Sequence, residues 1–268
     1  MFGVCQWSLN LKKDANGCTV VAVSASPKTI QSGIYNYDGK LWNPLLPLNS
    51  NINLNLVTGS SADDLYFASA LGVVFKFQYL LGNLGLGGFE KFQNLYHYDG
   101  DLLEPLVVDP FTTLYVSDVF AARDTKFITG LMQNADSGSS LIWKSQKKGD
   151  KEEWVSLQTP SYLPKEAMIT DIFALSESEF YMLAVGLNDN KDNKDENNMK
   201  GLVYHYINGN WITVPLTGLN LDLQNTLFTE VWASSPSDVY IVGMNLALAK
   251  SQGGVDALVM LRYNGKAW

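Results

Sequence analysis

Cysteine and histidine are scarce in this sequence, which contains two residues of each among 268. Cys5 and Cys18 have no histidine near them and no spacing typical of metal ligands, so the sequence predicts no zinc site. The two thiols are compatible with buried free cysteines and, in an extracellular protein, with one disulfide. No cofactor is expected.

Long apolar runs and an excess of positive charge are also missing. No run of about 18 apolar residues occurs, so no transmembrane helix is predicted. Met1 to Asn10 lacks the features of a signal peptide, which leaves the compartment open. Acidic residues outnumber basic ones by 27 to 19, and this charge opposes nucleic acid and anionic lipid. We therefore expect a protein or glycan partner, with no nucleic acid and no membrane insertion.

Sequence motifs for phosphate binding and hydrolysis are absent as well. The sequence has no GxGxxG followed by a helix, no GK[ST], no GxSxG and no HExxH. With 46% hydrophobic and 17% charged residues, the chain has the composition of a folded globule and not of a disordered protein.

The sequence does contain a clear internal repeat, which is the first feature to look for in a chain of this size. Each copy has an apolar residue, alternating aromatic residues and a turn with glycine: IYNYDGKLW from Ile34, LYHYDGDLL from Leu95, VYHYINGNW from Val203 and MLRYNGKAW from Met260, with a degenerate copy over Leu141–Trp154. Glycine after Asp or Asn suits a tight hairpin turn, because these residues adopt positive φ at little cost. Turn chemistry explains these pairs without a ligand.

Three further runs of β-branched and aromatic residues accompany each copy. They are bounded by turn-forming residues, as strands are. The run directly before each copy begins at Cys18, Asp64, Thr125, Glu179 and Asp238, and the run before that one begins at Ser117, Thr170 and Thr229. The run that follows the glycine begins at Trp42, Trp154 and Trp211. Four short strands per repeat are typical of propeller blades. The sequence predicts an all-β fold, a β-propeller of five blades with four antiparallel strands each. We expect one domain over 1–268, with repeats near 1–48, 49–108, 109–158, 159–216 and 217–268.

The segment WASSPSDVYIVG, Trp232 to Gly243, is followed by an apolar strand and YNGKAW. This combination resembles the repeat of bacterial β-propeller proteins in the broad kelch-like and WD-like group. The resemblance implies blades around a central channel but no activity, since such folds serve as scaffolds, lectins and enzymes. The last repeat reaches Trp268 before its outer strand is complete. Met1 to Asn10 is expected to form the first strand of the first repeat; the alternatives are that it completes the last blade, or that the natural chain continues past Trp268.

One strand position carries a large aromatic residue in three successive repeats, Phe120, Phe173 and Trp232. We interpret these residues as packing between neighbouring blades, so that Trp232 belongs to the core. The alternative is an aromatic platform for a ligand, and exposure separates the two.

Acidic residues stand at an equivalent position of the same three strands. If these strands line the channel, Asp118, Asp171 and Glu230 converge there as ligand-binding candidates, and their repulsion raises their pKa values or requires a cation. The alternative is that each carboxylate accepts backbone N–H bonds. His97 and His205 also share one repeat position but lie in non-adjacent repeats, so a catalytic or metal-binding pair is not expected.

The longest predicted connections all join the second strand of a blade to the third, over 70–94, 131–140, 187–201 and 244–257. They gather at one end of the fold, which is the expected binding face. The acids of Asn188–Asn198 lack the spacing of a calcium loop, so a solvated loop is predicted there. The apolar insertion 73–92 is either a hairpin on its own blade or a partner-binding surface. Its partner-binding candidates are Phe75, Phe77, Leu84, Leu86 and Phe89.

These features predict a non-enzymatic binding or scaffold propeller that presents loops on one face to a protein or glycan. The alternative is a glycoside-acting enzyme with carboxylates in the central funnel, which requires two carboxyl groups roughly 5 to 10 Å apart.

Overall fold

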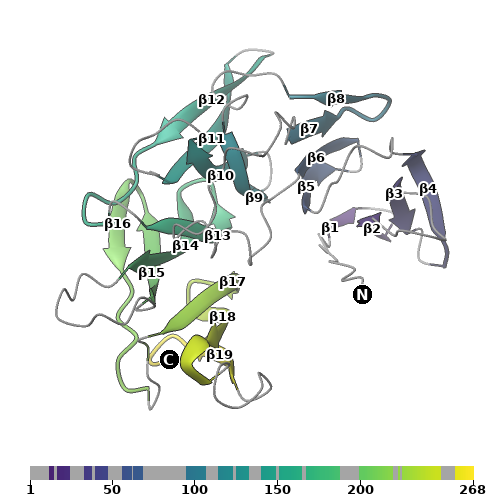
Figure 1. Cartoon of the computed structure of the whole chain (residues 1–268). Helices are drawn as coiled ribbons and strands as arrows, with labels where there is room; N and C mark the ends of the chain where they lie inside the picture. The colour runs from purple at the N-terminus through teal and green to yellow at the C-terminus, as the bar shows by residue number, and fades with distance from the viewer. Residues whose placement is uncertain are drawn as a thin grey trace, which may run out of the picture.

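The computed structural model describes residues 12–14, 17–24, 33–37, 40–47, 56–61, 63–68, 95–106, 114–122, 125–132, 140–148, 151–164, 167–187, 199–219, 223, 225–248 and 257–268. These residues form five antiparallel sheets in chain order (Figure 1). The all-β prediction is confirmed. No helix in this part of the chain is long and apolar enough to cross a membrane.

Four of the sheets have four strands each, in the order of the chain. The first consists of β1 (Lys12–Asp14), β2 (Gly17–Ser24), β3 (Gly33–Tyr37) and β4 (Trp42–Pro47). The second consists of β5 (Leu56–Ser61), β6 (Asp64–Ala68), β7 (Leu95–Tyr98) and β8 (Leu103–Pro105). The third consists of β9 (Leu114–Ala122), β10 (Thr125–Met132), β11 (Ser140–Lys148) and β12 (Lys151–Leu157). The fourth consists of β13 (Met168–Ser176), β14 (Glu179–Leu187), β15 (Met199–Ile207) and β16 (Asn210–Thr213).

The fifth sheet has three strands within the described residues: β17 (Thr226–Ser235), β18 (Asp238–Asn245) and β19 (Leu258–Tyr263). After β19 the chain turns, and the Asn264 N–H donates to the Ala267 carbonyl at 3.2 Å. Four-stranded sheets are thus confirmed for four repeats, and the described part of the fifth repeat forms a sheet of three strands. Among the described residues, the first strand of the first sheet is Lys12–Asp14, and Met1 to Asn10 lies outside the described part.

The short connections have the predicted turn chemistry. Between β15 and β16, Asn208 and Gly209 adopt φ values of 47° and 89°, as a two-residue hairpin turn requires. Gly265 has a φ of 86° in the same place after β19. The Asn264 side chain accepts the N–H groups of Lys266 and Ala267, both at 3.1 Å, so the turn holds itself together without a ligand.

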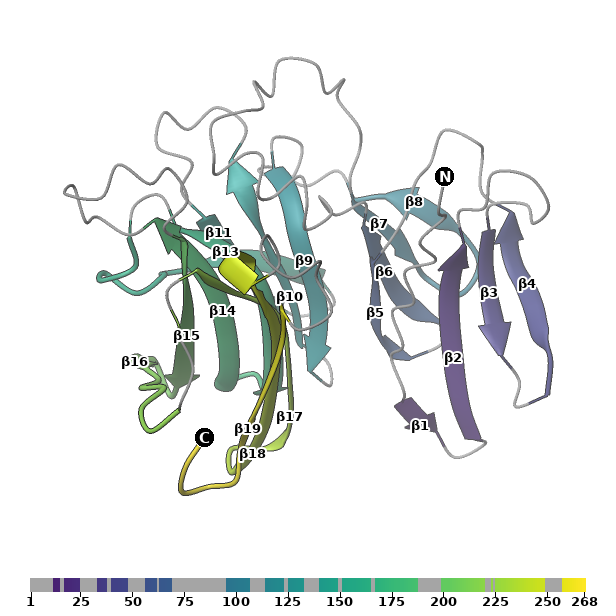
Figure 2. The same ribbon diagram turned by 60° about the horizontal axis from the view of Figure 1, so that its bottom comes forward.

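Successive sheets pack face to face through apolar residues. Between the third and fourth sheets lie Phe127, Ile142, Ile169 and Phe180, all fully buried. A similar cluster joins the fourth sheet to the fifth, and smaller ones join the first three sheets. The first strands of neighbouring sheets lie against one another, β5 against β9, β9 against β13 and β13 against β17. Figures 1 and 2 show these strands at the inner edge of the row of sheets.

Candidate functional site

The inner strands carry the predicted acids, and two of them bond to the next strand. The Asp118 carboxylate on β9 accepts the Ile172 N–H of β13 at 3.3 Å, and Asp171 on β13 accepts the Val231 N–H of β17 at 2.6 Å. Both aspartates are 9% exposed. Glu230 stands one residue before Val231 on β17, as Asp171 stands before Ile172, and is exposed. The structure therefore gives two of the three candidates a role in joining sheets, and the binding role of all three stays a prediction.

The aromatic residues of the same strands form a row. The ring centroids of Phe120 and Phe173 are 4.7 Å apart, and those of Phe173 and Trp232 are 6.2 Å apart. Phe120 and Phe173 are partly buried and pack against the core of the following sheet. Trp232 is 51% exposed, so its assignment to the core was wrong. In the third and fourth sheets, the next sheet along the chain covers the corresponding residues, Phe120 and Phe173. No further sheet is described beyond β19.

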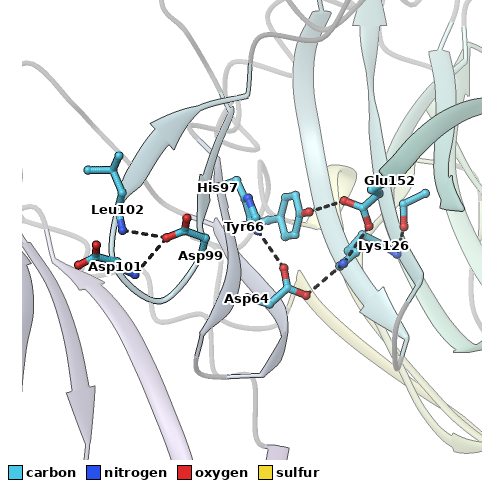
Figure 3. Close-up of polar contacts among 9 residues, drawn as sticks. Asp64, Tyr66, His97, Asp99, Asp101, Leu102, Lys126 and Glu152 are labelled. Atoms are coloured by element: carbon cyan, nitrogen blue, oxygen red, sulfur yellow. Dashed lines mark hydrogen bonds and ion pairs between the residues drawn. The ribbon is translucent and has the colours of Figure 1, made fainter. Parts of the chain in front are cut away.

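A cluster of charged and polar side chains joins the second and third sheets (Figure 3). The Lys126 ammonium group on β10 lies 2.8 Å from Glu152 Oε1 on β12 and 3.0 Å from Asp64 Oδ2 on β6. The Tyr66 hydroxyl on β6 donates to Glu152 Oε2 at 2.5 Å, and His97 Nε2 on β7 lies 2.9 Å from Asp64 Oδ1. Asp64 and Glu152 thus each have one partner in the second sheet and one in the third. The cluster therefore fixes the two sheets against each other.

The electrostatics of this cluster favour a structural role over a catalytic one. Burial lowers the pKa of the Lys126 ammonium group, but hydrogen bonds to Glu152 and Asp64 outweigh it, and the net effect is a raised pKa. Burial, followed by the hydrogen bond to Glu152, raises the pKa of the Tyr66 hydroxyl well above its ordinary value. A lysine that stays protonated and a tyrosine that stays neutral are poor nucleophiles and bases at neutral pH.

Two other sheets repeat part of this arrangement. Glu179 lies 3.0 Å from His205 Nε2, and the His205 ring stacks on Tyr181 with centroids 4.3 Å apart. In the fifth sheet, Asp238 lies 3.0 Å from Arg262 Nε. The two histidines hold the same repeat position, and each pairs with the acidic residue that begins the neighbouring strand, Asp64 of β6 or Glu179 of β14. A column of acids opposite a column of His or Arg in the repeats is a sequence signal that could have identified these pairs.

Lys126 and Glu152 could not have been identified from the repeat. They meet Asp64 and Tyr66 only because the second and third sheets pack face to face, and no other repeat has a lysine at the position of Lys126. Within the described residues, no group of three or more His, Cys, Asp or Glu side chains could hold a metal ion. The apolar candidates Phe75, Phe77, Leu84, Leu86 and Phe89 lie outside the described part of the chain.

The strand bounds make the two ends of the sheets different. In the second to fifth sheets, two residues separate the first strand from the second, as in the turn from Ser235 to Asp238. The turns from the third strand to the fourth are also short, for example the turn between Ile207, which ends β15, and Asn210, which begins β16. At the opposite end, the connections from the second strand to the third span 69–94, 133–139, 188–198 and 246–257. We call the end with the short turns the smooth end and the end with these long connections the elaborate end. The prediction that the longest connections join the second strand to the third agrees with these bounds.

Two solved structures show what this arrangement of sheets is similar to. One is YCF48 bound to D1 peptide, with a TM-score of 0.51 and 12% identity, covering 91% of this chain and 60% of the other. The second is a GH74 xyloglucanase from Xanthomonas campestris, with a TM-score of 0.53 and 10% identity, covering 95% of this chain and 36% of the other. Both neighbours are β-propellers. The fold is a β-propeller.

The propeller likeness shows the fold alone, because identity is low. This chain spans 60% and 36% of the lengths of the two neighbours. No protein-family model matches the sequence, and no curated protein matches it. The resemblance to the kelch-like and WD-like group is therefore supported only at the level of the propeller fold. The two neighbours differ in what they do, since one is bound to a peptide and the other is a xyloglucanase.

Proposed function

We propose that this propeller is a non-enzymatic binding or scaffold module that presents the connections at its elaborate end to a protein or glycan. The observation that carries this proposal is the difference between the two ends of the sheets. Turns of two to four residues close one end, whereas the other carries connections as long as 69–94. Ligand-binding residues concentrate on such loops above a rigid scaffold.

The proposal includes one domain of five blades over residues 1–268, with repeats near 1–48, 49–108, 109–158, 159–216 and 217–268. The five sheets in chain order support it. It also includes the partner-binding residues Phe75, Phe77, Leu84, Leu86 and Phe89. Burial of apolar surface like theirs against a partner is favourable by roughly 25 cal/mol per Å² removed from water.

The geometry of the inner strands favours a binding module over a glycoside-acting enzyme. A retaining or inverting glycosidase needs two carboxyl groups directed at one bond. The Asp118 and Asp171 carboxylates instead accept backbone N–H bonds from the adjacent strands. A ligand bound by Asp118, Asp171 and Glu230 would have to leave the backbone hydrogen bonds of the two aspartates in place.

Two variants and a hydrolysis assay test the proposal. Variant L84S/L86S and a variant with 188–198 replaced by a short Gly-Ser linker are compared with wild type on a glycan array and a displayed peptide library. We expect at least one variant to lose the wild-type binding pattern while its melting temperature holds, because loop closure changes by only about 0.6 kcal/mol per doubling of length.

N208D, in the β15–β16 turn at the smooth end, is the matched control and should leave binding unchanged. Release of reducing sugar from xyloglucan or another polysaccharide by wild type, abolished in D118N or D171N, would replace the binding proposal by the enzyme. Wild type that binds no glycan and no peptide would contradict the proposal itself.

A further inference from the structure

The contacts between successive sheets, which we call joints, centre on residues of the second strands. The third residue of one second strand packs against the next sheet, and the second residue of the next second strand packs back against it. Between the third and fourth sheets these residues are Phe127 and Phe180, whose ring centroids lie 5.2 Å apart. Between the fourth and fifth sheets they are Tyr181 and Val239, both buried in one apolar cluster. Both joints therefore have an apolar centre.

The joint between the second and third sheets has a lysine at this place. Here the third residue of β6 is Tyr66, and the second residue of β10 is Lys126, where the next two sheets have apolar residues. The Lys126 ammonium group lies 5.2 Å from the centroid of the Tyr66 ring. It also lies between Asp64 and Glu152, as Figure 3 shows. Of the three joints between the second and fifth sheets, this one has a charged centre.

The same joint differs from the other two at the inner strands. The carboxylates of Asp118 and Asp171 connect β9 to β13 and β13 to β17. Strand pairing puts Leu56 of β5 at the equivalent position, because Leu56 lies opposite Ala68, the fifth residue of β6, as Asp171 lies opposite Leu183, the fifth residue of β14. A leucine side chain accepts no hydrogen bond, so β5 is connected to β9 without this carboxylate contact.

A joint with a charged centre costs less to open than an apolar one. When two apolar faces separate, their surface enters water and nothing offsets the loss of burial. When Lys126 separates from Asp64 and Glu152, the three charged groups recover hydration, which offsets the lost attraction. The Asp64 and Glu152 side chains are 25% and 23% exposed, so water already reaches both carboxylates in the closed joint.

We propose that the propeller opens locally at the joint between the second and third sheets, while the third, fourth and fifth sheets stay packed on one another. Local openings that require less free energy than global unfolding are a general property of folded proteins. The ion pairs of Lys126 hold the joint closed, and their separation exposes the apolar residues beside them, among them Ala68 and Val116. The joint is a contact between sheets, so this proposal does not depend on the proposed function.

Cysteine labelling measures the opening of single joints. Ala68 and Ala184 are fully buried on second strands, Ala68 in the charged joint and Ala184 in the joint between the third and fourth sheets. Each is replaced by cysteine in the whole chain with C5S/C18S, and modification by N-ethylmaleimide at pH 7 is followed by intact-protein mass spectrometry. We expect A68C to react at least about tenfold faster than A184C, because the charged joint opens at lower free energy.

A second pair of variants guards against a local defect at either alanine. V116C probes the charged joint and V203C the joint between the fourth and fifth sheets, at valines that are 1% and 2% exposed. V116C should react at least about tenfold faster than V203C, for the same reason.

Two further substitutions separate local opening from global unfolding. In the A68C protein, K126M should accelerate labelling at least about tenfold, because it removes the cation that holds the joint closed. I241A is the matched control, since Ile241 is buried between the fourth and fifth sheets. It destabilises the whole fold but should leave labelling of A68C within about twofold, because its site is independent of the charged joint.

Equal labelling rates of A68C and A184C, together with equal rates of V116C and V203C, would overturn the proposal. An acceleration of A68C labelling by I241A as large as that by K126M would overturn it as well, because the thiol would then react only after global unfolding.

Discussion

Replacement of Lys126 by methionine tests the polar cluster between the second and third sheets. The Lys126 side chain is 7% exposed and lies within 3.0 Å of Asp64 and Glu152. Methionine keeps most of its length and removes the charge. The substitution then leaves two carboxylates from facing sheets without their shared cation.

The expected loss of stability follows from the exposure of the carboxylates. Breaking a fully buried ion pair on one side costs about 3 to 5 kcal/mol. The Asp64 and Glu152 side chains are 25% and 23% exposed, so water partly resolvates them and we expect a loss of about 2 to 3 kcal/mol for K126M. K126M/E152Q should recover part of it, with a coupling energy of about 1 kcal/mol or more.

Urea unfolding at pH 7 measures these free energies. K148M is the matched control, because Lys148 pairs with Glu153 at the surface with its side chain 74% exposed, and such a pair contributes about 0.5 kcal/mol or less. A loss below about 0.5 kcal/mol for K126M would show that the cluster does not hold the sheets together. Equal losses for K126M and K148M would refute the reasoning in the same way.

Three further outcomes follow from burial and hydrogen bonding. Because Trp232 is 51% exposed and Phe228 is fully buried, W232A should cost no more than about 1 kcal/mol of unfolding free energy in urea and F228A about 3 to 5 kcal/mol; equal costs would contradict this. Burial raises the pKa values of Tyr181 and Tyr204 to about 12 each, so their contribution to stability is complete below pH 10 and is lost between about pH 10 and 12. The melting temperature of Y181F should therefore fall less over this range than that of wild type, and an identical fall would disprove the assignment. D171N should cost about 1 to 3 kcal/mol by thermal melts, because the 2.6 Å bond from the Val231 N–H loses its charged acceptor; an unchanged melt would show that this bond does not join the sheets.

The repeat in the sequence was sufficient to predict the strands and their grouping. The runs predicted to begin at Glu179 and Asp238 begin β14 and β18, and the run from Val203 begins within β15. Strand alternation and Asn-Gly turns are local properties, since each depends on residues close together in the chain. The same repeat predicted the difference between short turns and long connections, which carries the proposed function.

The contacts between sheets were decided by the tertiary structure. Trp232 has the same strand position as Phe120 and Phe173, and only the absence of a described sheet beyond β19 leaves it exposed. Asp118 and Asp171 look like channel acids in the sequence, but their carboxylates reach the N–H groups of the adjacent inner strand. The physical reason is that burial and hydrogen bonding between sheets depend on which surfaces meet, and residues such as Lys126 and Asp64 meet across 62 positions of chain only because their sheets pack face to face.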